Sequence, residues 1–339
     1  MSDLDPLGPW EAVDMYLEHR RDELAERTLS SHFYRLKQFC EWCDEEEIDN
    51  INDVNGRTLH RYKVYRRDEQ GVAPTTLKGD FDTLRMFIGV CEALDAVEQG
   101  LKSKMLVPSV TGAEGVREQT LETNRAEEVL GHLERYEYAS RTHAMLQLVW
   151  HVGMRTGGLR TIDLDDCDLE GEAPGIAIRH RPETDTPLKN QEAGERDVNV
   201  SEEVAAVLRD YIDVNRNEVV DEYGREPLFT SSHGRVSRAC VQDWFYRSTR
   251  PCVIGNPCPK GRDPNECEAM EPNLATLCPD SVAPHAVRSG SITYQRRQGV
   301  PPEIVSDRVN ASEDVIEKHY DMRTHRDRMQ QRRQHLEGL

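Results

Sequence analysis

The sequence has little positive charge, few aromatic residues and no long apolar segment. Acidic residues number 62 against 43 basic ones, which gives a formal net charge of −19, and only 8 of the basic residues are lysines. Aromatic residues make up 6% of the chain. No apolar run approaches the roughly 18 residues of a membrane-spanning helix, so no such helix is expected. No secretory signal peptide opens the chain, and we therefore expect a cytoplasmic protein.

The excess of acidic residues indicates both the solvent to which the protein is adapted and the kind of partner it binds. A strongly acidic chain normally argues against nucleic acid binding, because carboxylates repel phosphates. Arginine in place of lysine, together with few aromatics, favours another interpretation, in which carboxylates keep the protein soluble in concentrated salt. A partner that selects for acidity is the alternative. Residues 281–302 contain no acidic residue, and a basic stretch in so acidic a chain indicates a polyanionic partner.

The N-terminal third predicts a set of short helices. Apolar residues recur at helical spacing in four segments, at 10–17, 33–43, 59–65 and 77–91. Thr28 is expected to cap the second of these helices. Cys40 and Cys43 lie on an apolar helical face without a second cysteine pair nearby, so core packing is favoured over a metal site.

The 339 residues are enough for two domains with sizeable cores. Residues 1–107 are expected to form a helical domain, and residues 108–119, with proline and glycine, a linker. Residues 120–339 are expected to form an α-rich domain with a small β-sheet, in which residues 175–180 and 197–200 alternate like paired strands. Helices are predicted in this second domain at 124–136, 140–152, 204–214 and 241–246. The predicted fold class is therefore mainly α.

Near the C-terminus, helical segments carry residues suited to phosphate chemistry. His285 and Arg288 are three residues apart, so they share one face of a helix. A Gly-Val-Pro-Pro break at residues 299–302 precedes a second helix. Ser312 opens a third helix, which delivers Tyr320 near its end.

This arrangement resembles the C-terminal half of the tyrosine recombinase (phage integrase) family, in which an H-x-x-R helix is followed by a tyrosine nucleophile. The Gly-Met-Arg-Thr-Gly-Gly-Leu-Arg segment at 153–160 resembles the first arginine box of that family, and a lysine in the predicted hairpin matches its catalytic lysine. The resemblance covers nearly the whole chain. It implies a catalytic set of five residues: Arg155, Lys189, His285, Arg288 and Tyr320.

The residue types fit the chemistry that the resemblance implies. Two arginines can hold the non-bridging oxygens of a phosphodiester and stabilise the charge of its transition state. The phenol of Tyr320 is a nucleophile once its proton is withdrawn. His285 can manage that proton or hold the phosphate, and Lys189 can protonate the leaving oxygen. The expected product is a covalent 3′-phosphotyrosine, formed without a catalytic cofactor.

Three positions bear on this assignment. Ala311 stands where the family usually has a second histidine or a tryptophan, and Gly158 where it often has an acidic residue. Support for Arg155 is then expected from elsewhere in the chain. Arg160 is the competing candidate for the role of Arg155, and its place in the pattern argues against it.

The resemblance implies a site-specific DNA recombinase, an integrase of a mobile element in a halophile, with haloarchaeal character. Its N-terminal core-binding domain would clamp duplex DNA, and a tetramer would act on synapsed DNA. A topoisomerase-like enzyme and a decayed, non-catalytic DNA-binding module are the alternatives. Phosphate contacts are expected in the N-terminal domain, although each side chain is as readily explained as a solvated one, at Thr28, Arg35, Thr75, Thr76 and Lys78.

An insert rich in proline, glycine and charge precedes His285. It holds four cysteines, Cys252, Cys258, Cys267 and Cys278. Crowded thiols in a cytoplasmic protein indicate a structural zinc ion, which would hold together a segment with no core of its own. The spacing lacks paired C-x-x-C motifs, so disulfides and unlinked thiols remain alternatives.

Overall fold

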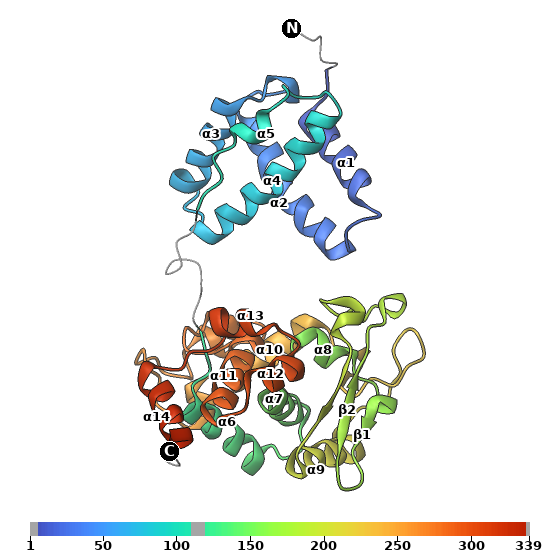
Figure 1. The fold of residues 1–339 in the computed structure, drawn as a ribbon, viewed down its shortest axis with the longest axis vertical. Coiled ribbons are helices and arrows are strands. Elements are labelled where there is room, and N and C mark those ends of the chain that lie inside the picture. Colours follow the sequence, from blue (N-terminus) through green and yellow to red (C-terminus); the bar gives the residue numbers. More distant parts are fainter. Residues whose placement is uncertain (1–5, 110–118, 337–339) are drawn as a thin grey trace. The chain divides into compact units, whose positions relative to one another are not determined.

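Two compact units make up the chain, Met1–Arg117 and Glu118–Leu339. The computed structural model describes residues 6–109 and 119–336 (Figure 1). Each unit has its own hydrophobic core. The linker predicted at residues 108–119 falls mostly on 110–118, which lie outside the described residues. Within the described ranges, no helix has the length and apolar character needed to cross a membrane.

In residues 6–109, the N-terminal unit is built from helices and the loops that join them. Its α-helices are α1 (Pro9–Arg20), α2 (Glu26–Glu45), α3 (Gly56–Val64), α4 (Pro74–Ala93) and α5 (Leu101–Lys104). Aromatic rings form the centre of the core, where Phe39 meets Tyr62 at 5.1 Å between ring centroids. Cys40 and Cys43 are fully buried in this core, and burial raises the pKa of both thiols. The prediction that they pack in the core is confirmed.

One helix start differs from the prediction. Helix α2 begins at Glu26 with Ala25 as its N-cap, so Thr28 lies inside the first turn and does not cap the helix. The backbone N–H of Thr28 donates to the carbonyl of Ala25 at 2.8 Å. The turn therefore closes before Thr28 is reached, and its hydroxyl is not needed as a cap.

The second unit combines nine α-helices with two small sheets in the described part of the chain. The helices are α6 (Thr123–Tyr136), α7 (Arg141–Val152), α8 (Thr156–Thr161), α9 (Glu202–Asp210), α10 (Arg238–Ser248), α11 (Pro284–Arg297), α12 (Pro302–Val309), α13 (Glu313–His319) and α14 (His325–Leu336). Helix α7 lies in the interior, in contact with α6, α9, α10 and α11 (Figure 1). Seven of its twelve residues are buried, which explains its almost continuous run of apolar residues.

A small antiparallel sheet carries the hairpin predicted from the alternating residues. Its strands are β1 (Cys167–Asp168), β2 (Gly175–Ile178) and β3 (Arg196–Asn199), with β2 in the middle. Ile176 pairs with Val198, and both are buried against the core. A two-stranded ribbon of β4 (Thr230–Ser231) and β5 (Gly234–Arg235) lies apart from it in the sheet topology.

Gly153 brings the end of α7 against the last residue of α12, Val309. Its φ is 75°, in the left-handed region, and a Cβ there would lie 2.9 Å from Val309 Cγ1. Glycine therefore satisfies both the helix C-cap and the close approach. Two residues later the chain reaches Arg155 at the N-cap of α8.

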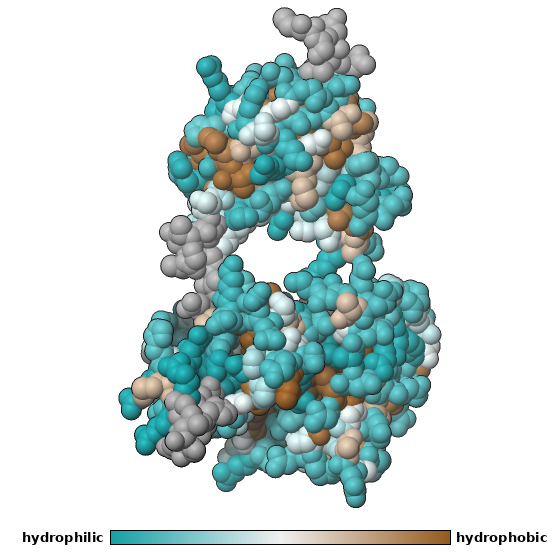
Figure 2. All heavy atoms as spheres, viewed as in Figure 1, coloured by the Kyte–Doolittle hydropathy of each residue, from teal (hydrophilic) through white to brown (hydrophobic). Residues whose placement is uncertain are grey.

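The surface is strongly hydrophilic, as the composition requires. Hydrophilic residues cover most of the face drawn in Figure 2, with small hydrophobic patches between them. Helix α11 is an exception to the acidic character, because none of its residues is acidic.

Candidate active site

Arg288 is the most deeply buried charged residue of the candidate site, with 1% of its surface exposed. It projects from α11, and its Nη1 donates to the carbonyl oxygens of Gly153 at 2.6 Å and Val309 at 2.9 Å. Burial and the positive charge of Arg155 lower the pKa of Arg288 to about 10, while the phenol of Tyr320 acts in the opposite direction. The guanidinium therefore remains charged at neutral pH in an interior that is already electropositive.

The rest of the Arg288 guanidinium makes no hydrogen bond of good geometry, although the Tyr320 phenol lies beside it. Its Nε and Nη2 are buried and meet no acceptor of suitable geometry in the described part of the chain. A buried cation with unused donors is costly unless an anion completes it. The site is thus built to receive a negatively charged group beside Arg288.

Tyr320 lies beside this guanidinium at the end of α13. Ser312 caps that helix by accepting the N–H of Val315, and Thr293 Oγ1 donates to the Tyr320 carbonyl at 2.7 Å. The centroid of the Tyr320 ring is 5.0 Å from Arg288 Cζ and 5.4 Å from the His285 ring. Only 6% of the Tyr320 surface is exposed, so packing fixes the phenol against both neighbours.

Arg155 reaches the same site from the start of α8. Its Nη1 donates to the Asn310 carbonyl at 2.7 Å. Arg160 is engaged elsewhere, because its Nε donates to the Val236 carbonyl at 2.8 Å and its Nη2 lies 4.0 Å from an Asp185 carboxylate oxygen. Gly158 is buried and provides no carboxylate. Backbone carbonyl support from Asn310 takes the place of the acidic residue.

Asn310 is a positioning residue that the sequence analysis missed. It adopts a left-handed conformation (φ 51°) as the C-cap of α12, which asparagine tolerates better than most residues. Its side chain accepts from Asn190 Nδ2 at 2.6 Å and donates to the Ala193 carbonyl at 2.8 Å. One residue therefore joins Arg155 to the loop that follows Lys189. An asparagine directly after an amphipathic helix was the available signal.

Lys189 and His285 complete the group of five predicted residues. Lys189 is exposed in the loop between β2 and β3. His285, the second residue of α11, keeps contact with solvent on one side. Packing around its ring, and then the charges of Arg288, Arg155 and Lys189, lower the pKa of His285 below its usual 6.5. The structure thus brings together all five predicted residues, with His285 neutral at pH 7.

Arg196 is a further cation at this site, and the sequence analysis did not single it out. It belongs to β3, and its Nε and Nη1 donate to the carbonyls of Arg308 and Gly194, each at 2.9 Å. Burial, and then the charges of Arg288 and Arg155, lower the pKa of Arg196 to about 10. Ala311 itself is buried in an apolar cluster with Tyr320 and carries no donor. Arg196 is thus a candidate to supply the donor that Ala311 lacks.

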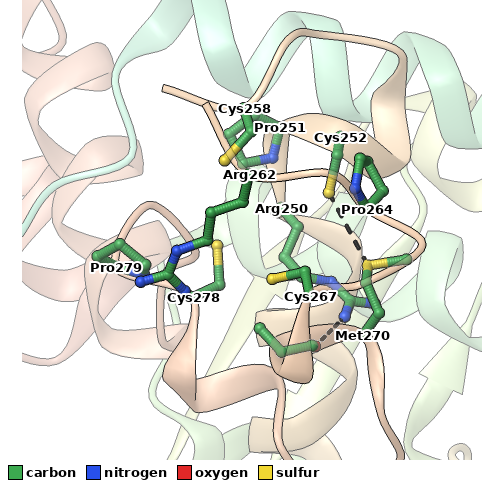
Figure 3. A pocket seen from close by; sticks show the side chains of 11 residues that line it. Arg250, Pro251, Cys252, Cys258, Arg262, Pro264, Cys267, Met270, Cys278 and Pro279 are labelled. Carbon is green, nitrogen blue, oxygen red and sulfur yellow. Dashed lines mark hydrogen bonds between the residues drawn. The ribbon is translucent and has the colours of Figure 1, made fainter. Parts of the chain in front are cut away.

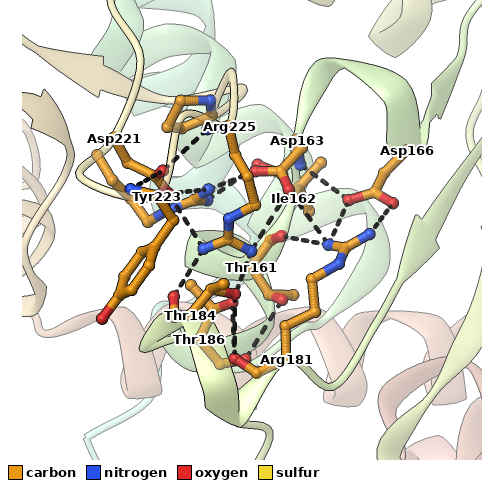
Figure 4. A network of polar contacts seen from close by, with 12 residues as sticks. Thr161, Ile162, Asp163, Asp166, Arg181, Thr184, Thr186, Asp221, Tyr223 and Arg225 are labelled. Atoms are coloured by element: carbon orange, nitrogen blue, oxygen red, sulfur yellow. Dashed lines mark hydrogen bonds and ion pairs between the residues drawn. The ribbon is translucent and has the colours of Figure 1, made fainter.

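A network of arginines and aspartates holds the sheet that carries Lys189 (Figure 4). Arg181 makes a two-pronged contact with the Asp166 carboxylate, at 2.9 and 2.7 Å. Arg225 donates to the Thr184 carbonyl at 2.7 Å and to Thr186 Oγ1 at 3.1 Å. Because Thr184 and Thr186 lie just before Lys189, the network fixes the start of its loop.

The predicted DNA-contact residues lie on neighbouring helices of the N-terminal unit. Thr28, Thr75 and Thr76 are exposed. Arg35 donates to the Gly79 carbonyl at 3.2 Å and Thr83 Oγ1 at 3.0 Å, and Lys78 pairs with Asp82 at 2.6 Å. Both cations therefore have partners within the unit. A DNA contact from any of the five residues stays a prediction.

The four cysteines of the insert line one pocket. Among residues 6–109 and 119–336, no three His, Cys, Asp or Glu side chains are gathered closely enough to hold a metal ion in this structure.

Known recombinases are similar to this chain in sequence. No protein-family profile matches it. A Methanocaldococcus jannaschii protein named "Probable integrase/recombinase protein" is 22% identical over 296 residues, which are 86% of this chain and 79% of that protein. Tyrosine recombinase XerC of Stutzerimonas stutzeri is 28% identical over 162 residues, and this match spans 46% of the chain and only 52% of that relative.

Solved structures extend the similarity to the fold. The Tn1549 transposon integrase, in complex with a circular intermediate DNA, aligns over 97% of this chain and 99% of its own, with a TM-score of 0.67 and 14% identity. The N-terminal domain of a phage integrase/site-specific recombinase from Haloarcula marismortui is 37% identical. That match covers 30% of this chain and 98% of that domain, with a TM-score of 0.29.

Proposed function

We propose that this chain, which is similar to tyrosine recombinases in sequence and fold, is a site-specific DNA recombinase that cleaves and rejoins duplex DNA in the cytoplasm through a covalent bond to Tyr320. The observation that carries this proposal is the buried guanidinium of Arg288, which offers unused donors beside the Tyr320 phenol. A phosphodiester supplies the missing anion. The same placement puts its phosphorus next to the nucleophile.

In the proposed first step, the Tyr320 oxygen attacks the phosphorus and the bond to the 5′ oxygen breaks. His285 takes the phenolic proton, which suits a histidine that is neutral at pH 7. Lys189 gives a proton to the leaving 5′ oxygen. Arg155, Arg288 and Arg196 stabilise the charge that develops on the non-bridging oxygens.

In the second step, the 5′ hydroxyl of another strand attacks the phosphotyrosine, and Tyr320 leaves with its proton restored. The phosphotyrosine conserves the energy of the broken bond, so rejoining needs no other energy source. Exchange between two duplexes involves four strands, and each subunit carries one Tyr320. We therefore propose that four subunits act together on synapsed DNA.

The test is covalent capture on DNA that carries a nick beside the cleavage position, followed by denaturing electrophoresis. Wild type should form the adduct, and Tyr320→Phe should form none while it still binds the DNA. Tyr294→Phe is the matched control. Tyr294 lies toward the C-terminal end of α11, where its ring centroid is 5.7 Å from that of Trp150. This variant should react like wild type. An adduct from Tyr320→Phe would reject Tyr320 as the nucleophile.

Arginine replacements test the anion site in the same assay. Removing one oxyanion donor typically costs about 10²–10³ in rate, so Arg155→Ala should slow cleavage by that order. Arg288→Lys keeps the charge but loses the planar fork, and it should also be slow. Relaxation of supercoiled plasmid lacking any attachment site, at the same rate as cleavage of the cognate site, would favour the topoisomerase-like alternative. If wild type forms no adduct on its own attachment DNA, the chain is a binding module.

A further inference from the structure

The segment between α10 and α11 has very little core of its own. Its base is closed by Thr249, whose Oγ1 accepts the N–H of Val282 at 2.9 Å. Between these two residues the structure shows only single 3₁₀ turns and loops. The buried apolar side chains of this stretch are Pro251, Ala269 and Ala275. One proline ring and two methyl groups bury too little apolar surface to offset the entropy of ordering so long a loop.

We propose that this segment, residues 250–281, is a zinc module in which Cys252, Cys258, Cys267 and Cys278 bind one Zn²⁺ through their thiolates. All four are half-buried and line a single pocket, and Figure 3 shows their side chains around the same hollow. The five other cysteines of the chain are absent from its lining. The thiols come from separate turns of the loop, so one ion would join them all.

The lining of the pocket suits a thiolate site electrostatically. Zinc binding by four thiols releases four protons and leaves a centre of net charge −2. Two arginines, Arg250 and Arg262, line the same pocket (Figure 3) and offset that charge. The backbone also holds Arg250 in place, since its Nη1 donates to the Ala269 carbonyl. The remaining lining consists of prolines, Ala269 and Met270, which are apolar.

The pocket must contract for all four sulfur atoms to reach one ion, because no three of them are yet close enough in the described residues. The intervening turns permit this movement. Gly255 and Gly261 have φ of 85° and 64°, and the turns around them belong to no helix or strand. Cys252 Sγ currently contacts Met270 Sδ at 3.9 Å, a weak contact that a zinc bond easily replaces.

The module would determine how α11 starts. The segment ends three residues before Pro284, the first residue of α11, and His285 follows Pro284 directly. Arg125 also ties the base of the segment, since its Nη2 donates to the carbonyls of Thr249 and Asp280. A loop fixed by zinc would therefore hold the first turn of α11, and His285 with it, in place. This inference does not depend on the strand-exchange chemistry.

Metal content of the purified full-length chain is the first test. The expected result is about one zinc per chain, with four thiols that react with a thiol reagent only after chelation. Replacing zinc with Co²⁺ should give thiolate-to-cobalt charge-transfer absorption and the visible bands of tetrahedral cobalt. Absence of both metal and cobalt bands, or disulfide-linked peptides among these four cysteines, would overturn the proposal.

A pair of double variants locates the site. Cys258→Ser/Cys278→Ser should lose the metal, whereas Cys167→Ser/Cys240→Ser removes as many thiols outside the pocket and should retain it. Retention of full metal content in the first variant would overturn the assignment. If the first variant does not fold, the cobalt spectrum of wild type still decides, because four thiolates absorb more strongly than two or three.

Discussion

The substitution Asn310→Gly should weaken the positioning of Lys189 and leave the other residues of the site in place. Glycine accepts the left-handed φ of this position, so the backbone that holds Arg155 is retained. The substitution removes the hydrogen bonds to Asn190, at 2.6 Å, and to Ala193, at 2.8 Å. At a net value of about 1 kcal/mol each, the docked Lys189 loop loses about 2 kcal/mol, which changes the ratio of docked to undocked loop by up to roughly 30-fold.

The expected defect depends on the leaving group. Single-turnover cleavage of an ordinary nicked substrate should slow by up to about 30-fold, because Lys189 must protonate the leaving oxygen. A substrate with a 5′-bridging sulfur needs no such proton, so its cleavage should stay within about twofold of wild type. The double variant Lys189→Ala/Asn310→Gly should be no slower than Lys189→Ala alone on the ordinary substrate.

Equal losses on the oxygen and sulfur substrates would refute this reasoning, since they would show that Asn310 acts on the phosphate or on Arg155. Additive losses in the double variant would do the same. DNA binding by Asn310→Gly should be unchanged, which a filter-binding assay can establish before the kinetic comparison.

Three further outcomes follow from the structure. Arg196→Ala should slow covalent capture at least about tenfold with little change in DNA binding. The control Arg179→Ala, directly after β2 in the same hairpin, should capture DNA at the wild-type rate. Equal capture rates for Arg196→Ala and wild type would remove Arg196 from the site. His143 and His151 each accept a backbone N–H, and burial lowers the pKa of both to about 4. Between pH 6.5 and 4 the unfolded chain then binds more protons than the folded one, so the second unit should lose up to about 1.4 kcal/mol per histidine per pH unit as pH falls; a flat urea midpoint over this window would contradict it. The net charge of −19 predicts a higher melting temperature at 3 M than at 0.1 M KCl, because the screening length shrinks from about 10 Å at 0.1 M to about 3 Å already at 1 M; equal melting temperatures would reject salt adaptation.

Local patterns in the sequence were sufficient for most of the helices and for the hairpin, whereas the five residues of the proposed site were taken from the resemblance to a known family. Because His285 and Arg288 are three residues apart, they share one face of a helix whatever the rest of the fold. The alternation of apolar and polar residues at 175–180 predicts β2 without tertiary information. Thr28 shows the limit of such rules, because helix α2 could start as well at Glu26, and packing decided between the two.

Residues that act through the backbone escaped prediction for a physical reason. Arg196 lies on a strand, and the alternating pattern predicts only which face of the sheet its side chain is on. Its hydrogen bonds to the carbonyls of Arg308 and Gly194 depend on the tertiary fold. Asn310 offered a C-cap signal, but its link to the Lys189 loop spans more than a hundred positions in sequence. The supporting contacts of Arg155 and Arg288 are carbonyl groups, which every residue has.

The carbonyl groups of Val309 and Asn310 link the two arginines to the position of the nucleophile. Arg288 binds the Val309 carbonyl and Arg155 the Asn310 carbonyl, and the turn that carries both leads directly into the short helix ending at Tyr320. Displacing this helix together with the turn would withdraw the nucleophile and remove one supporting carbonyl from each arginine, although Arg288 would keep its hydrogen bond to the Gly153 carbonyl. An idle subunit would then keep no half-assembled centre in which water could hydrolyse the backbone. The chain would either cut with its tyrosine or leave the genome untouched.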